Sequence, residues 1–218
     1  MADIYTNCPN CKAPIKSGVF NSNIIVTDEN KVKVINEFTE SKSPAYCTTC
    51  VFNLQNQAKI AWSKLMEDAK KTFEKLLTII PVVTLQNPKD WDYRVLRMVT
   101  AQSVTGTGVV SEISSSFSDF FGMQSNRLNS KLRNGENICK SALRMEAISL
   151  GGNAIIATDI DYAEVGGDKG MLMVCMSGTA IKLKNLDILE VVKPDNFAVL
   201  FAANAAIIHL EKFQAYFG

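Results

Sequence analysis

Four of the six cysteines stand in two closely spaced pairs, Cys8 with Cys11 and Cys47 with Cys50. A Cys-x-x-Cys pair can turn both of its thiolates toward one point, so two such pairs complete the tetrahedral shell that zinc prefers. Sulfur would then fill every coordination position and leave none for water or substrate, so we expect the zinc to be structural. Redox-active dithiols, or thiols that bind nothing, are the alternatives.

A second set of sulfur donors lies in the C-terminal half of the chain. Met171, Met173 and Cys175 alternate along a segment typical of a strand, and the alternation places all three on one face. Two thioethers and a thiol are soft ligands of the kind that copper(I) prefers. Methionine and buried cysteine also fill cores well, and the intervening residues are equally apolar, which predicts burial on both faces. Core packing is therefore the alternative to a soft-metal site.

Two carboxylates also share a predicted strand face. Asp159 and Asp161 are separated by one residue, and Glu164 and Asp168 follow closely. Converging carboxylates of this kind can hold a hard cation such as calcium or magnesium. Ordinary pairing with lysines or backbone donors is the alternative for the same residues.

Groups that could act in catalysis are scarce. His209 is the only histidine, and it lies in an apolar run with neither a serine motif nor a cysteine nearby. We therefore expect no enzymatic activity, and we expect His209 to be packed or to lie at a helix end. The remaining enzymatic hypothesis is a pocket between subunits that brings together Arg127, Asp161 and Tyr162.

Short elements must position the cysteines. Residues 23–27 and 31–35 are rich in β-branched side chains and flank the polar segment 28–30, which predicts a hairpin. The second cysteine pair runs into a helical pattern, and the positive end of that helix would favour both thiolates. A knuckle, a hairpin and a second knuckle at a helix start resemble the treble-clef and zinc-ribbon modules.

An amphipathic helix is predicted from residue 54 to residue 80, where apolar residues recur at spacings of three and four before Pro81 ends it. Its lysines are typical of a solvated face rather than of a nucleic-acid groove. The apolar stripe comprises Leu54, Ala58, Ala61, Leu65, Ala69, Phe73, Leu76 and Ile80, and the lysines are Lys59, Lys64, Lys70, Lys71 and Lys75.

The rest of the chain alternates between strand and helix patterns. We expect a long helix whose core face carries Cys139, Leu143 and Ala147, ended by Gly151 and Gly152. The glycine-rich residues 166–170 predict a turn. The expected elements, in chain order, are strands at 79–85 and 93–104, helices at 111–121 and 129–150, and strands at 154–165 and 171–183.

Several segments in this half resemble the YbjQ family, which carries a heavy-metal-binding label. The resemblance covers about residues 79–184, and its motifs recur in order. It implies a two-layer α/β subunit of the dodecin-like sort that assembles into rings, typically pentamers. The segments that carry it are 117–122, 150–154, 159–162, 171–174 and 177–180.

Charge and hydropathy exclude several classes of partner. Lys and Arg total 23 against 22 Asp and Glu, so the chain lacks the basic excess that nucleic acid or an anionic membrane would favour. The N-terminal residues lack the pattern of a signal peptide, which predicts a cytoplasmic protein. Residues 197–210 are apolar nearly all round but too few to span a bilayer, so they predict a buried helix.

The expected fold class is α+β: a zinc module, a two-layer YbjQ-like domain that forms a ring, and a C-terminal helix. The expected function is that of a non-enzymatic, homo-oligomeric scaffold that uses its zinc module to contact another protein. A metal-handling protein with a second metal, and an enzyme with a pocket between subunits, are the alternatives. The expected divisions are 1–53 (zinc module), 54–78 (connecting helix), 79–184 (YbjQ-like domain) and 185–218 (C-terminal extension).

Overall fold

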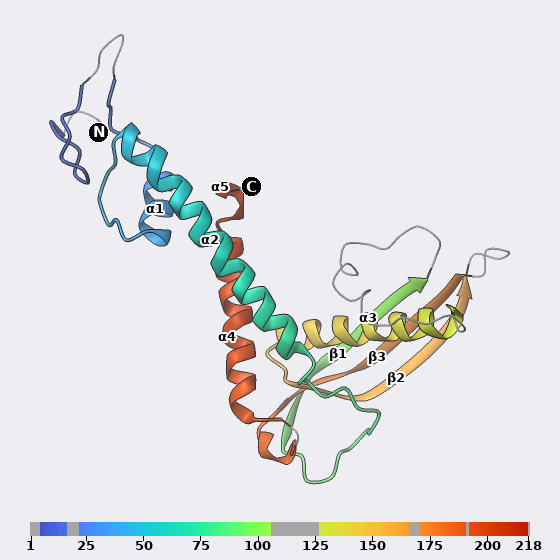
Figure 1. Cartoon of the computed structure of the whole chain (residues 1–218). Coiled ribbons are helices and arrows are strands. Elements are labelled where there is room, and N and C mark those ends of the chain that lie inside the picture. Colours follow the sequence, from blue (N-terminus) through green and yellow to red (C-terminus); the bar gives the residue numbers. More distant parts are fainter. Residues whose placement is uncertain (1–4, 17–21, 106–126, 166–170, 191, 218) are drawn as a thin grey trace. The chain divides into compact units, whose positions relative to one another are not determined.

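The computed structural model describes residues 5–16, 22–105, 127–165, 171–190 and 192–217, which divide into two compact units (Figure 1). The first unit comprises Met1–Phe73 and Ala202–Gly218, and the second comprises Glu74–Phe201. In chain order the elements are α1 (Glu29–Phe38), α2 (Thr48–Leu77), β1 (Tyr93–Thr105), α3 (Arg127–Ser149), β2 (Ala154–Val165), β3 (Met171–Leu183), η4 (Leu186–Ile188), α4 (Pro194–Glu211) and α5 (Gln214–Phe217).

The predicted hairpin between the cysteine pairs is wrong, because helix α1 takes its place. Asp28 caps this helix: its carboxylate accepts hydrogen bonds from the backbone N–H groups of Asn30 at 3.0 Å and Lys31 at 3.3 Å. Val34 and Ile35 are buried, at the spacing of one helix face. Residues 28–30, which were predicted to form a polar turn, are therefore the N-cap and the first residues of a helix.

Helix α2 begins at Thr48, directly after Cys47, and so extends further toward the N-terminus than the predicted helix. The predicted stripe is partly wrong, because Leu65 is 51 % exposed while the neighbouring Met66 is buried. Ala58 is buried as expected. The predicted lysine face is confirmed, since all five of its lysines are exposed.

Aromatic side chains hold the helices of the first unit together. Phe38 of α1 contacts Phe213 edge to face, with ring centroids 4.9 Å apart, and Trp62 of α2 lies 5.2 Å from Phe217 of α5. The indole N–H of Trp62 also donates to the carbonyl of Leu210 at 2.9 Å. These contacts join α1 and α2 to the C-terminal residues of the chain.

The second unit contains a three-stranded antiparallel sheet in the order β1, β3, β2. The ranges of β2 and β3 match the predicted strands. The predicted strand at 79–85 is only partly formed: it is no regular strand, but Val82 forms a parallel bridge with Ile155, and backbone hydrogen bonds join Pro81, Val83 and Leu85 to β2. The predicted helix at 111–121 and the turn at 166–170 lie outside the described residues.

Helix α3 lies along one face of this sheet (Figure 1). Its predicted core face is confirmed, because Cys139, Leu143 and Ala147 are buried against Val174 and Met176 of β3. The predicted glycine stop is also confirmed: the helix ends at Ser149 and Gly151 takes a left-handed φ of 78°. The core of the unit therefore lies between α3 and the sheet.

The other face of the sheet is only partly covered within the chain. At one end Ile181 and Leu183 are buried beneath η4 and the segment around Trp91. Further along β3, Met173 and Cys175 on this face are half-buried, whereas Val174 and Met176 on the α3 face are buried. The prediction of burial on both faces of β3 is therefore wrong for this part of the strand within a single chain.

Helix α4 contains the predicted apolar run but is not buried all round. Phe197 and Leu200 are buried, whereas Val199 and Ile208 are exposed. Among the helices in the described ranges, none combines the length and the apolar character needed to cross a membrane.

Candidate metal centre

The four paired cysteines converge in the first unit. The sulfur atoms of Cys8, Cys11, Cys47 and Cys50 all lie within 4.8 Å of one another. Cys8 and Cys50 are 4.0 Å apart, and Cys11 and Cys47 are 3.7 Å apart. A tetrahedral shell with Zn–S bonds of about 2.3 Å places its sulfur atoms about 3.8 Å apart. The cluster therefore has the size and donor type that a zinc ion requires.

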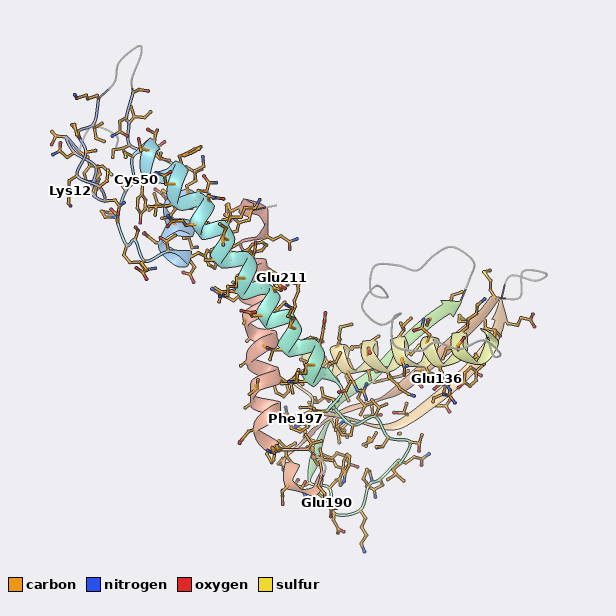
Figure 2. The ribbon with its side chains drawn as sticks, viewed as in Figure 1. Lys12, Cys50, Glu136, Glu190, Phe197 and Glu211 are labelled. Atoms are coloured by element: carbon orange, nitrogen blue, oxygen red, sulfur yellow. The ribbon has the colours of Figure 1, made fainter. Side chains whose placement is uncertain are left out.

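A tight knuckle presents the first pair of thiols. The backbone N–H of Cys8 donates to the carbonyl of Ala13 at 2.8 Å, and the N–H of Lys12 donates back to the carbonyl of Cys8 at 2.9 Å. Lys12 has a left-handed φ of 62° and follows Cys11 directly. Such a turn brings Cys8 and Cys11 to the same side of the chain. Figure 2 labels Lys12 of this turn near Cys50 of the second pair.

The second pair is presented by the start of α2. Cys47 forms a bridge with Ile25, and the N–H of Thr48 donates to the carbonyl of Ile24 at 3.0 Å. Cys50 lies in the first turn of the helix, where the helix dipole favours negatively charged groups. The expected placement of this pair at a helix start is confirmed.

Hydrogen bonds to sulfur join the two halves of the centre. The backbone N–H of Cys47 donates to Cys8 Sγ at 3.4 Å, and the Asn10 side chain donates to Cys50 Sγ at 3.4 Å. Burial raises the pKa of Cys8, but backbone N–H groups led by that of Cys11 outweigh burial and lower it to about 7. Burial raises the pKa of Cys50 to about 12. Of these two thiols, Cys8 therefore loses its proton more easily than Cys50.

The side chain of Tyr46 packs against the cysteines of the centre, and Tyr46 was not among the predicted site residues. It is fully buried beside Cys8, Cys47 and Cys50, and its hydroxyl donates to Asn36 Oδ1 at 2.6 Å. Its position directly before the second cysteine pair is the only sequence signal for this role, and Asn10 likewise has only its position within the first pair.

The cysteines differ in access to solvent. Cys8, Cys47 and Cys50 are buried, whereas Cys11 is exposed. Within the described ranges, no other set of three or more histidine, cysteine or acidic residues converges in this way. The four-cysteine cluster is therefore the candidate metal centre.

The other predicted metal ligands share one face of the sheet without forming such a cluster. Asp161 pairs with Cys175 across β2 and β3, and Asp159 pairs with Ser177. Together with Gln102 of β1 they line a shallow groove of about 150 Å³ on the face away from α3. Met171 and Met173 are half-buried further along β3.

Two residues of the enzymatic hypothesis, Asp161 and Tyr162, lie on opposite faces of the sheet in a single chain. The Tyr162 hydroxyl donates to Glu136 of α3 at 3.0 Å, so it lies on the face opposite the groove that Asp161 lines. The side chain of Arg127 lies outside the described residues. His209 lies in the last turn of α4, where its ring nitrogen is 3.1 Å from Glu37.

Sequence comparison places the second unit among known proteins. Residues 80–184 match the model of the YbjQ family, described as "Putative heavy-metal-binding". A UPF0145 protein of Listeria grayi is 35 % identical over 98 residues, which cover 45 % of this chain and 91 % of that protein. The chain belongs to the YbjQ family. A UPF0145 protein of Clostridium botulinum is 34 % identical over 84 residues, covering 38 % of this chain and 79 % of that protein.

A crystal structure from Pediococcus pentosaceus, of a protein of unknown function in the DUF74 family, is also similar. It is 19 % identical, covers 48 % of this chain and 98 % of its own, and has a TM-score of 0.33. The YbjQ match begins at residue 80, so the four cysteines of the metal centre lie outside it. The first unit is thus an addition to the YbjQ domain of this chain.

Proposed function

We propose that this YbjQ-family protein is a non-enzymatic, homo-oligomeric scaffold in the cytoplasm whose first unit is held together by a structural zinc ion. The observation that supports zinc is the convergence of four cysteine sulfur atoms within 4.8 Å of one another. A shell made only of cysteine leaves no coordination position for substrate or water. The metal therefore stabilises the fold of the first unit. The zinc module, displayed on the oligomer, provides a surface that binds another protein.

The proposed oligomer is a ring of YbjQ domains, with the pentamer as the favoured size. The half-buried face of β3 supports assembly, because strand residues that are apolar on both sides are typical of a sheet covered on both sides. The balanced charge of the chain supports a protein partner over nucleic acid.

Native mass spectrometry combined with elemental analysis tests this proposal. We expect a multimer with one zinc per chain, and a mass of five chains would support the pentamer. A monomer would contradict the homo-oligomer, and a protein that binds no zinc under reducing conditions would contradict the structural zinc.

A second candidate function is metal handling by the YbjQ domain. It is supported by the family description and by the register that sets Asp161 beside Cys175 on one face of the sheet. A thiol and a carboxylate in that position could hold a second metal ion. Titration of copper(I) and cadmium(II) into the zinc-loaded protein tests it: a second site should weaken in Cys175→Ser and Asp161→Asn, and unchanged binding in both would contradict it.

A further inference from the structure

The first unit exposes an apolar surface at the start of α2. Phe52 is 82 % exposed, the largest exposed fraction among the large apolar side chains in the described ranges. Ile24 is 45 % exposed and lies beside the first turn of the helix, because its carbonyl accepts the N–H of Thr48 at 3.0 Å. Thr48 precedes Phe52 by four residues, so the two share a helix face. Apolar side chains that gather on an exposed surface indicate a site for another molecule.

Hydrogen bonds fix the backbone beneath this surface. The hydroxyls of Thr48 and Thr49 both donate to Asn23 Oδ1 at 3.3 Å, and the Asn23 amide donates to the carbonyl of Pro14 at 3.2 Å. Lys16 pairs with Asn23 through two backbone hydrogen bonds, of 3.0 and 2.8 Å. The segment that carries Lys16 is therefore held against the first turn of α2, although the two are distant in the sequence.

Positive charge flanks the apolar surface. Lys16 lies beside Asn23, and Lys59 follows Phe52 by seven residues on the same exposed face of α2. Neither lysine forms an ion pair with a residue in the described ranges. The sequence segments that build this end of the unit, 5–27 and 41–66, contain five lysines and neither aspartate nor glutamate. The surface thus offers an aromatic side chain flanked by two lysines.

We propose that this surface binds a segment of another protein in which acidic residues flank an apolar side chain. The inference rests on the proposed function, in which the zinc module binds another protein, and it names the chemical class of that partner. The apolar side chain of the partner covers Phe52 and Ile24, and its carboxylates pair with Lys16 and Lys59. Phe52 and Lys59 are about 10 Å apart along the helix axis, a distance that about three residues of an extended peptide span. We therefore expect an acidic residue about three positions from the apolar one.

The arrangement of charge favours an acidic peptide over nucleic acid. The residues nearest Phe52 on the exposed face of α2 are neutral, namely Thr49 and Asn56. A single-stranded nucleic acid has a phosphate at every nucleotide, and proteins that bind it follow the backbone with a positively charged groove. Two separated cations around one aromatic side chain instead match a peptide whose carboxylates are also separated.

The cysteine centre holds the two halves of the surface together. Ile25 forms a bridge with Cys47, which joins residues 23–25 to the start of α2. Lys16 follows the knuckle that presents the first cysteine pair. Removal of the metal should therefore separate Lys16 from Phe52 and weaken peptide binding, although neither residue is a metal ligand.

Selection from a library of random peptides displayed on phage tests the partner class. The bait is the full chain, loaded with zinc and kept under reducing conditions so that the metal centre is intact. We expect the enriched peptides to carry aspartate or glutamate about three residues from an aromatic or aliphatic residue. A fluorescent synthetic copy of the most enriched peptide is then the probe, and its anisotropy gives the dissociation constant.

Substitutions with matched controls assign the binding to this surface. Phe52→Ala should weaken peptide binding at least about tenfold, because it removes the aromatic anchor. Lys16→Glu and Lys59→Glu should each weaken it about threefold to tenfold, because each sets a carboxylate against the acidic peptide. Leu65→Ala and Lys64→Glu are the controls: both residues are exposed on α2 outside the Phe52 face, and we expect affinities within about twofold of wild type. Circular dichroism and zinc content of each variant separate loss of binding from loss of fold.

The outcomes are distinguishable. A chain that binds no zinc would contradict the proposed zinc scaffold, whereas a zinc-loaded chain that enriches no acidic peptides would overturn this inference alone. Enriched peptides that bind the Phe52→Ala variant as tightly as wild type, or that bind equally well after the zinc is removed, would also overturn it. Tighter, Phe52-dependent binding of a single-stranded oligonucleotide would assign the surface to nucleic acid instead. A lower mass of the Phe52→Ala variant in analytical ultracentrifugation would assign it to a second copy of the chain.

Discussion

Cys11 and Cys47 lie 3.7 Å apart at their sulfur atoms, although 36 positions separate them in the sequence. Cys11 belongs to a knuckle near the N-terminus, and Cys47 immediately precedes α2. Between them lies α1, whose Ile35 packs into the same cluster as the cysteines. A metal ion bound by both residues would therefore close a loop that contains much of the first unit.

Cys47→Ser should reduce bound zinc from one per chain to near zero and destabilise the first unit, because binding energy of a structural zinc is folding energy. Elemental analysis and thermal unfolding in the presence and absence of a chelator measure both effects. Cys175→Ser is the matched control, since it makes the same change outside the centre and should keep the zinc. A Cys47→Ser protein with full zinc content and unchanged melting would disprove the structural role.

Tyr46 should make the first unit sensitive to high pH. Burial raises the pKa of its phenol, whose hydroxyl donates to Asn36 and to the carbonyl of Ser41. An unfolded tyrosine ionises near pH 10, so the folded state retains the proton where the unfolded state has lost it. The stability from the neutral phenol is therefore full below about pH 10 and falls as the pH rises above it.

Tyr46→Phe tests this assignment. The variant should unfold more easily at pH 7, by about 1–2 kcal/mol, because it loses the hydrogen bonds of the hydroxyl. It should also lose the part of the alkaline destabilisation that belongs to Tyr46. Chemical denaturation of the zinc-loaded protein at pH 7 to 11 provides the comparison, and identical alkaline behaviour of wild type and variant would argue against Tyr46.

Gly135→Ala should destabilise the second unit by about 1 kcal/mol or more. A β-carbon at this position would lie 2.8 Å from Val174 Cγ2, and the branched valine is fully buried and stiff. This overpacking exceeds the gain of about 1 kcal/mol that alanine normally brings to a helix interior. Asn134→Ala is the control, because it changes the exposed neighbour and should be neutral or slightly stabilising. Urea denaturation measures both, and a more stable Gly135→Ala variant would contradict the close approach.

Thr158→Val should stabilise the second unit by about 1 kcal/mol. The Thr158 hydroxyl is buried and has no hydrogen-bond partner among the described atoms, so the isosteric valine removes a desolvated polar group without opening a cavity. Thr158→Ser keeps the hydroxyl but loses the methyl group, and it should be destabilising. Urea denaturation distinguishes the two directions, and a destabilised valine variant would show that the hydroxyl has a partner.

Local pattern predicted the elements of the second unit better than those of the first. In β2 and β3 the alternating side chains and bounding glycines set the strand limits, and the stripe through Cys139 and Leu143 identified the buried face of α3. Around Val34 the same kind of reasoning failed. Lys31 to Ile35 satisfies strand alternation, but the cap from Asp28 and the burial of Val34 with Ile35 favour a helix.

The segment 79–85 shows a different limit of predicting strands from the sequence. Its β-branched residues are apolar enough for a strand, and it does hydrogen-bond to β2 through Val83 and Ile155. Only one residue pair, Val82 with Ile155, meets the geometry of a bridge. The amino-acid composition of a segment indicates whether it suits an extended, half-buried position. How many of its residues pair regularly depends on the neighbouring strand.

The sequence by itself determined the two cysteine pairs, the core face of α3 and the relationship to the YbjQ family, because each is a local pattern of residue types and spacing. Tertiary structure alone decided that Tyr46 and Asn10 contact the metal centre and that Asp161 lies beside Cys175. It also decided which face of β3 stays uncovered. Such contacts join residues distant in the chain, and they follow from strand register and helix packing, which no short stretch of sequence specifies.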